Sequence, residues 1–325
     1  MSSPIADLSY RHSDGPLERP ASRWWAIARA SMRLSMRKRG FWLWASFSGW
    51  FYVLLLAIFY FIDTLSQNVP VGEKNPLLMQ IVWKDQFLNA FSTAQLFYFI
   101  LALLIGVGTI ANDNRANALL VYLSKPCSRL DYIIGKWLGI FLPLTLVTAI
   151  PTAFFFLYGA MTYRDYGFLT EDPRLPLKLL AMVLIPGVVH SSLALGISSL
   201  FNQGRMAGAT YAGLYFFTLF FTKAMQIISL VHQGDRRMVP PIVEKLYYGS
   251  VDGLQIGLAK VILGTDGSNL FPGMNGGGGG GRRSTPNPLP VPAPEWWLMF
   301  GAAGAICALA LFVAWSRVKA VEVVG

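Results

Sequence analysis

The sequence predicts an all-α integral membrane protein with six transmembrane helices, an N-terminal amphipathic interfacial helix and a short cytoplasmic helix. Of its 325 residues, 54% are hydrophobic and 14% are charged, whereas a soluble domain averages about 25% charged residues. So few charges cannot keep so much apolar surface dispersed in water. The composition therefore excludes a soluble globular enzyme and an intrinsically disordered chain. The apolar residues gather in long runs, which predict where the chain crosses a bilayer.

The first 40 residues are polar and basic. Residues 1–21 contain three prolines and no long apolar run, so we expect a disordered cytoplasmic tail and no cleaved signal peptide. Residues 22–39 are predicted to form a helix. At 100° per residue, four of its arginines share one face, and three less polar residues lie opposite: Arg23, Arg29, Arg33 and Arg37 against Trp24, Ala28 and Met32. This pattern favours a helix in the membrane interface over a plain basic juxtamembrane segment.

Six segments are long and apolar enough to cross about 30 Å of hydrocarbon, and each is expected to be helical because lipid cannot satisfy an open backbone. None contains Asp, Glu, Lys or Arg apart from Lys223 in the fifth. Pro143, Pro151 and Pro186 predict kinks that serve either gating or packing. The predicted spans are 41–62, 87–111, 138–160, 179–201, 207–231 and 296–316.

Two ionisable side chains lie inside these spans. His190 sits in the middle of the fourth span, where such a residue is a functional candidate by default, although a neutral histidine bonded between helices is the commoner case. Lys223 lies toward the outer end of the fifth span, where it either snorkels outward or lines a path. His190 and Lys223 are therefore the candidate polar residues of a pathway.

The distribution of charge predicts the orientation. With the N-terminus in the cytoplasm, the inner segments 1–40, 113–137, 202–206 and 317–325 hold 15 Lys and Arg against 6 Asp and Glu. The outer segments hold 11 of each. The net charge of +10 thus indicates a positive-inside topology with both termini cytoplasmic, and it argues against a nucleic-acid partner.

The last outer loop, 232–295, has two parts. Residues 240–263 carry apolar residues at helical spacing, interrupted by glycines, and predict either two half-helices that dip into the outer leaflet or an amphipathic surface helix. Residues 264–295 are a Gly/Pro-rich linker. Its six consecutive glycines, 276–281, are not a phosphate-binding loop, because no Gly-Lys-Ser/Thr follows them.

The sequence contains none of the common catalytic, nucleotide-binding or metal-binding motifs. There is no nucleotide-binding loop, no HExxH pair, no GxSxG elbow and no Cys/His cluster with metal-ligand spacing. Cys127 and Cys307 are expected to be structural. We therefore expect no catalytic residue, no metal and no directly bound cofactor.

The cytoplasmic loop 112–137 is the most informative stretch. Asp113 or Asn114 is suited to cap a helix start, Ala116–Leu123 gives two apolar turns, and Pro126 ends them. Ser128 is suited to cap a second helix that runs into the third span. The loop therefore predicts a short helix lying across the cytoplasmic mouth.

This stretch resembles the permease subunits of ATP-binding-cassette (ABC) transporters, in the type-two exporter family. The resemblance covers about 30 residues in motif and most of the chain in architecture. The matching features are the acidic entry at Asp113, the run Leu119–Ser124, the sequence Lys125-Pro126-Cys127-Ser128-Arg129, and Tyr132 with Gly135-Lys136 before the span.

The resemblance implies that residues 22–325 form a single permease domain of an exporter in the bacterial cytoplasmic (inner) membrane. The loop would be its coupling helix, docked on a separate cassette ATPase that uses the ATP. The implied contacts are Asp113, Arg115, Leu119, Leu120, Leu123, Lys125, Pro126 and Arg129. A second permease subunit, identical or different, would complete the pathway.

Two other classes of protein are alternatives. A secondary transporter or channel predicts internal repeats and conspicuous charges at the midplane. A membrane-embedded enzyme predicts a catalytic pair that faces across spans. The sequence shows neither a repeat nor such a pair.

Overall fold

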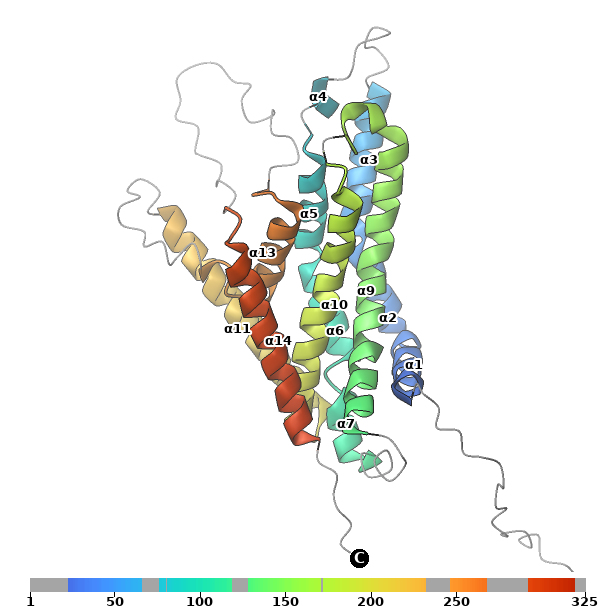
Figure 1. Ribbon diagram of the computed structural model, residues 1–325, viewed down its shortest axis with the longest axis vertical. Helices are drawn as coiled ribbons and strands as arrows, with labels where there is room; N and C mark the ends of the chain where they lie inside the picture. Colours follow the sequence, from blue (N-terminus) through green and yellow to red (C-terminus); the bar gives the residue numbers. More distant parts are fainter. Residues whose placement is uncertain are drawn as a thin grey trace, which may run out of the picture.

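The computed structural model describes residues 23–65, 76–79, 81–118, 128–170, 172–231, 246–267 and 292–318. Every regular element within these ranges is a helix. The expected tail 1–21, most of the linker 264–295 and residues 119–127 lie outside the described residues. Figure 1 shows α9 and α10 running side by side along the long axis, with α11 and α14 inclined to them.

Among the residues that the structure describes, five helical stretches are long and apolar enough to cross a membrane: Arg39–Thr64, Gln95–Arg115, Arg129–Thr162, Leu175–Ser199 and Trp296–Arg317. The predicted class, an all-helical membrane protein, is confirmed for the described residues. The remaining predicted span falls in α11, one continuous helix over Gly204–Val231. The count of six spans stays a prediction.

The first two predicted spans are divided into shorter helices. Arg39–Ser48 (α2) and Trp50–Leu65 (α3) meet at Gly49. The expected helix 87–111 is replaced by α5 (Trp83–Thr93), α6 (Gln95–Ile105) and α7 (Thr109–Arg115). The turn at 106–108 allows a close approach, since a Cβ on Gly106 would lie 2.8 Å from the Ala194 Cβ.

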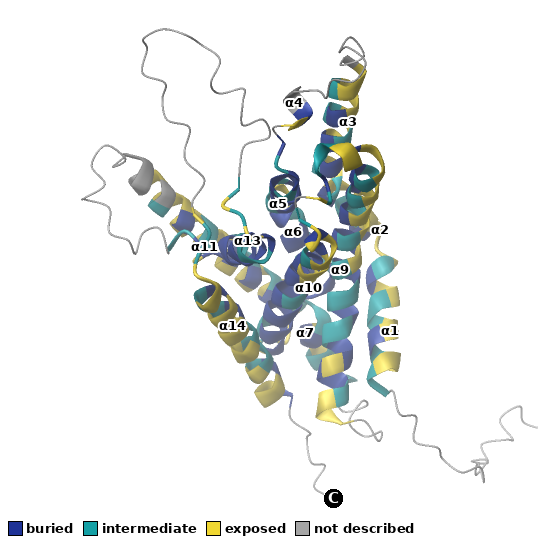
Figure 2. Ribbon diagram, turned by 45° about the horizontal axis from the view of Figure 1, so that its top comes forward, coloured by how far each residue is buried: buried dark blue, intermediate teal, exposed yellow. Residues whose placement is uncertain are grey.

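α10 (Leu175–Ser199) forms the centre of the bundle, and Figure 2 shows it mostly in the colour of buried residues. A Cβ on Gly196 would lie 2.7 Å from the Ala310 carbonyl oxygen of α14 (Trp296–Arg317). Small residues thus let these backbones approach closely, which is how helices associate in lipid, where burial of apolar surface gives no driving force.

An aromatic cluster fills the end of the bundle opposite α7, between α3, α5 and α9 (Arg129–Thr162). The ring of Trp83 stacks on Tyr163 with centroids 5.0 Å apart and meets Phe59 and Phe168 edge-on. The indole N–H of Trp83 donates to the Tyr166 carbonyl (3.2 Å), in the short helix η2 (Arg164–Tyr166) that follows α9. This cluster fixes the end of α9 against α3 and α5.

The N-terminal helix α1 (Arg23–Met36) packs against the first turns of α9. Ala28 is buried while Arg29 and Arg33 are exposed, so the predicted division of faces is confirmed. α9 has 34 residues and is about 51 Å long, which exceeds the hydrocarbon thickness of about 30 Å. Its first turns are therefore available to hold α1 outside the hydrocarbon.

The described part of the outer loop includes α13 (Val251–Leu263), a helix that Gly253 and Gly257 do not break. It packs against α5, α10, α11 and α14, and Leu254, Gln255 and Leu258 on it are buried. This burial favours a helix inserted among the spans over an exposed surface helix.

The segments predicted to face the cytoplasm lie at one end. Figure 1 shows α1, α7 and the end of α14 at the lower end, and α4 (Pro76–Met79) and the end of α3 at the upper end. The separation of the two sets agrees with the charge count. Which end faces the cytoplasm stays a prediction.

We predict that Gly139→Ala destabilises the protein by about 1–3 kcal/mol, the usual cost of overpacking. The added Cβ would lie 2.5 Å from the Ser31 Cβ, so α1 must move away from α9. The thermal midpoint of the solubilised chain measures the effect. Gly301→Ala is the matched control, since a Cβ there meets nothing within 4 Å. Equal midpoints for both variants would contradict the proposed packing.

Candidate functional site

The candidate site is the end of the bundle where α7 stops and α9 begins. Asp113 of α7 faces two side chains of α9. Its Oδ2 accepts a hydrogen bond from the Tyr132 hydroxyl (2.7 Å) and forms an ion pair with the Lys136 Nζ (2.7 Å). The Lys136 Nζ also lies 5.5 Å from the centre of the Tyr132 ring. We call Asp113, Tyr132 and Lys136 the Asp113 cluster.

The Asp113 cluster is largely removed from solvent. The side chains of Lys136 and Asp113 are 9% and 19% exposed. An ammonium group this far buried is costly unless a carboxylate pairs with it, so the ion pair is a condition for placing Lys136 here. The three residues belong to the motif that carried the resemblance, and in the structure they act together to join α7 to α9.

α7 is held at its start as well. The turn at 106–108 interrupts the helix, and the first N–H groups of α7 then lack partners within it. The Ser198 hydroxyl of α10 accepts hydrogen bonds from the backbone N–H groups of Ile110 and Ala111, each 3.0 Å away. The Asn114 amide donates to the Phe201 carbonyl (3.4 Å), just after α10. α7 is therefore tied to α10 as well as to α9.

The predicted cap at Ser128 is confirmed. Its hydroxyl accepts from the Asp131 N–H (3.1 Å), and the Asp131 carboxylate accepts from the Ser128 N–H (3.1 Å). This reciprocal capping box fixes the first residue of α9 at Arg129. The expected cap at Asp113 or Asn114 is wrong, since both lie inside α7. The helix instead ends at Arg115, and Asn117, two residues later, has a φ of 50°.

The structure divides the predicted coupling residues into three groups. Asp113 is turned inward to the Asp113 cluster, whereas Arg115 and Arg129 are exposed. The other five, Leu119, Leu120, Leu123, Lys125 and Pro126, lie outside the described residues. Asp113 therefore holds the two helices that flank the loop, and the exposed arginines remain available to a partner.

His190 is fully buried, and its ring connects three helices. The Nδ1 atom lies 2.6 Å from the Tyr211 hydroxyl of α11, and the Nε2 atom lies 3.1 Å from the Gln255 amide of α13. This arrangement matches the commoner expectation, a histidine bonded between helices. Lys223 lies elsewhere, on an exposed position of α11, so the two candidate pathway residues are not brought together.

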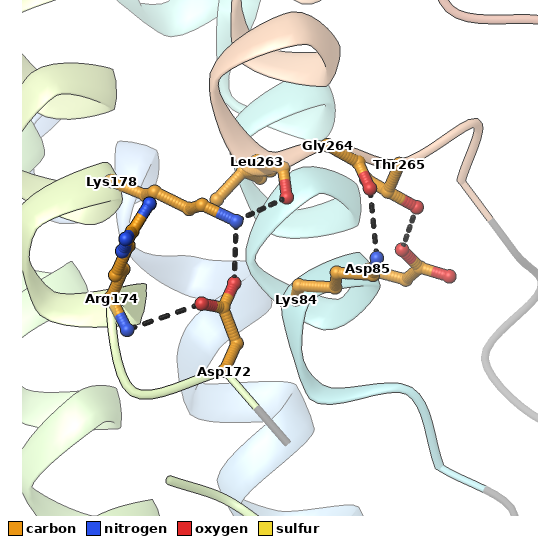
Figure 3. A network of polar contacts seen from close by, with 8 residues as sticks. All are labelled: Lys84, Asp85, Asp172, Arg174, Lys178, Leu263, Gly264 and Thr265. Carbon is orange, nitrogen blue, oxygen red and sulfur yellow. Dashed lines mark hydrogen bonds and ion pairs between the residues drawn. The ribbon is translucent and has the colours of Figure 1, made fainter. Parts of the chain in front are cut away.

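The C-terminal end of α13 is held by two lysines that sequence reasoning missed (Figure 3). Lys178 of α10 donates to the Leu263 carbonyl (3.2 Å), and Lys84 of α5 donates to the Gly264 carbonyl (2.8 Å). Cations at this position stabilise a helix because its last carbonyls carry partial negative charge. The signal in the sequence was Gly264, directly after α13. A glycine there predicts where the helix ends, but not which side chains bind its last carbonyls.

Lys178 also forms an ion pair with Asp172 (2.6 Å) in the turn before α10. Burial alone would raise the pKa of Asp172, but the hydrogen bond and charge of Lys178 outweigh it and hold the pKa below its usual value. The hydroxyl of Thr265 donates to the Asp85 carboxylate of α5. These contacts fasten α13 to both neighbouring helices.

Within the described ranges, no group of three or more His, Cys, Asp or Glu residues is arranged to hold a metal ion.

A family model described as ABC-2 family transporter protein matches residues 25–245. The chain belongs to this family. The match includes most of α1, both helices of the Asp113 cluster and the loop between them. The chain is accordingly a membrane-spanning subunit of the ABC permease type.

A curated relative is also described as an ABC transporter permease. The probable ABC transporter permease protein NosY of Pseudomonas aeruginosa is 28% identical over 149 residues. The match covers 43% of this chain and 52% of that protein, so the chain spans about half the length of the relative.

We predict that Asp113→Ala destabilises the protein by about 2 kcal/mol, because it removes the carboxylate that pairs with the buried Lys136 ammonium. The double variant Asp113→Leu with Lys136→Met should recover part of this loss, since an apolar pair replaces a buried ion pair at low cost. The thermal midpoint of the solubilised full chain measures both.

Asp63→Ala is the matched control, since Asp63 is an exposed carboxylate at the end of α3. It should change the midpoint little. Additive losses in the double variant would contradict a direct pairing of Asp113 with Lys136.

Proposed function

We propose that this ABC-2 family protein is the permease subunit of an ATP-driven exporter, and that a separate cassette ATPase drives it through residues 113–129. The observation that carries the proposal is the Asp113 cluster, which joins the two helices on either side of that loop. The chain would use no cofactor of its own, because the ATP is bound and hydrolysed by the partner.

The mechanical argument follows from the contacts of α7. The capping box fixes one end of the loop to α9, and the Asp113 cluster fixes the other end to the same helix. The hydrogen bonds of Ser198 to the backbone of α7 join α7 to α10 as well. A push on the loop would therefore displace α7, α9 and α10 together. Coupling between distant sites requires a structural unit that moves as a whole between two positions, and these three helices would be that unit.

The contacts with the ATPase would come from the part of the loop that faces away from the bundle. Arg115 and Arg129 would supply polar contacts at the rim, with Lys125 beside them. Leu119, Leu120 and Leu123 would supply the apolar contact, and Pro126 would set where the short helix ends. Asp113 would act from behind this surface by positioning the helices.

The assembly would contain two permease subunits and two ATPase subunits, the permeases being identical or different. It would lie in the bacterial cytoplasmic membrane with both termini on the cytoplasmic side, as the charge distribution predicts.

Leu120→Ser and Pro126→Ala test the coupling. Both leave the number of Lys and Arg residues unchanged, so topology should be kept. We expect them to weaken ATPase binding or to lower transport per ATP hydrolysed severalfold in the reconstituted assembly. The matched control is Leu200→Ser, which changes another exposed leucine at the end of α10.

A crosslinking scan gives an independent readout. Single cysteines across 113–129 should crosslink to the ATPase more strongly than cysteines at 202–206. Equal crosslinking at both places would refute the proposal that residues 113–129 contact the ATPase. Sustained ATP hydrolysis by the purified chain alone would refute the proposal that a separate subunit hydrolyses the ATP.

A further inference from the structure

A carboxylate with one buried oxygen lies where α11 meets α13. Asp252 is in the first turn of α13, and its Oδ2 atom accepts a hydrogen bond from the Tyr215 hydroxyl of α11 (2.7 Å). The ring of Phe99 on α6 stacks on Tyr215 with centroids 3.8 Å apart, which holds the hydroxyl in place. The other oxygen of Asp252, Oδ1, is buried and has no hydrogen-bond partner among the described residues.

A second buried acceptor lies one turn further along α13. The side-chain nitrogen of Gln255 lies 3.1 Å from the His190 Nε2 atom and 3.3 Å from the Val251 carbonyl oxygen. Because a carbonyl oxygen only accepts hydrogen bonds, the nitrogen of the amide must face it, and the orientation of the amide is fixed. The Gln255 Oε1 atom is fully buried, and within the described part of the chain it also lacks a partner.

His190 does not supply the missing donor. Its Nε2 atom accepts from the Gln255 amide, so the single hydrogen of a neutral imidazole is on Nδ1, 2.6 Å from the Tyr211 hydroxyl. Both ring nitrogens are therefore satisfied in the neutral form. His190 orients Gln255, and it leaves the Oε1 atom of that residue without a donor.

One proton would satisfy both of these oxygens. Asp252 and Gln255 are three residues apart, so their side chains lie on the same side of α13. A buried acceptor without a donor is costly, and the cost is larger on a charged group. A proton on Asp252 Oδ1 makes a donor, and Gln255 Oε1, one turn away, is an acceptor for it. The Oδ2 atom keeps the hydrogen bond from Tyr215.

We propose that Asp252 is a proton-binding site, and that it is neutral while α11 is packed on α13. The proton comes from water when the helices pack, and it returns to water when they separate and the carboxylate is hydrated. The packed arrangement then holds more protons than the separated one, so lowering the pH stabilises the contact between α11 and α13. The proposal uses contacts within this chain alone and does not rest on the proposed function.

The cation on α11 does not replace this proton. Lys223 and the position of Asp252 near the N-terminus of α13 both favour the ionised form. Lys223, however, is eight residues after Tyr215, or about 12 Å along α11. It is also exposed, so water screens its charge, whereas the Asp252 Oδ1 atom is buried.

The other charged groups around α13 gather near its last turn. They are eight or more residues beyond Asp252, about 12 Å or more along the helix, or on the neighbours of that end. They hold the last carbonyls of α13, contact the turn after it, or line one pocket with Gly264: Lys84, Asp85, Lys178, Lys260, Asp266 and Glu295. Within the described residues, the groups that face Asp252 are thus Tyr215, Lys223 and, through Gln255, His190.

Infrared spectra of the full chain in nanodiscs measure the protonation directly, because a neutral carboxyl group and a carboxylate absorb at different frequencies. The difference between the spectra of the unaltered protein and Asp252→Asn isolates the band of this residue. We expect at least half of the neutral band to remain at about pH 5, where an ordinary exposed aspartate is about nine-tenths ionised. Asp63→Asn is the matched control and should keep the band, since Asp63 is exposed at the end of α3.

Two further variants should move the titration in opposite directions. Gln255→Leu removes the acceptor for the added O–H and should lower the proton affinity of Asp252. Tyr215→Phe removes a donor to the ionised form and should raise it. We expect each change to be about fivefold to tenfold, the contribution of one hydrogen bond.

The thermal midpoint gives a second readout. Asp252→Asn carries an amide that donates at every pH, so it should raise the midpoint at about pH 8 relative to the unaltered chain and change it little at about pH 5. Asp63→Asn should leave the midpoint close to that of the unaltered chain at both pH values.

Two results would overturn the proposal. A neutral band of Asp252 that is absent at about pH 5 would mean an ordinary ionised carboxylate. Shifts in the same direction in Gln255→Leu and Tyr215→Phe would mean a general effect of burial. Both of these variants keep Asp252, so their comparison decides the proposal even where Asp252→Asn fails to fold.

Discussion

The ion pair between Asp113 and Lys136 is the constraint on which the loop end of the bundle depends. α7 has seven residues, and a helix that short has little stability of its own. Its structure therefore comes from its partners, which are the Asp113 cluster at one end and Ser198 at the other. Because the pair is largely buried, losing either member removes a stabilising opposite charge from the other at a site with little access to water.

Close approach of helix backbones explains the rest of the bundle. Gly135 and Gly139 let α1 lie directly on α9, and Gly196 does the same for α14 on α10. α13 is added to this frame by polar contacts, through His190 in the interior and through Lys84 and Lys178 at its end. The helices that flank residues 113–129 thus belong to one packed body.

Much of the architecture was predictable because it depends on local properties of the chain. Long apolar runs predict spans, and Ser128 followed three residues later by Asp131 predicts the start of α9. The family resemblance rested on the same short-range pattern, and the match over 25–245 confirms it.

The remainder depends on contacts between residues far apart in sequence. The role of Asp113 is set by Lys136, and the break at 106–108 is stabilised by a hydroxyl 88 residues after Ile110. The burial of α13 likewise depends on lysines of α5 and α10. A sequence shows that such residues are polar, but it does not show what they face, so the contacts of Asp113 with Tyr132 and Lys136 were not predicted.

The most direct measurement of the central claim is the distance between spin labels at positions 112 and 130, one on α7 and one on α9, in the assembled transporter. Both positions are exposed, so labels should be tolerated. If the Asp113 cluster makes these helix ends one body, the distance and its distribution should be the same with and without ATP. A shift on ATP binding would show that α7 moves independently of α9, and it would contradict the account.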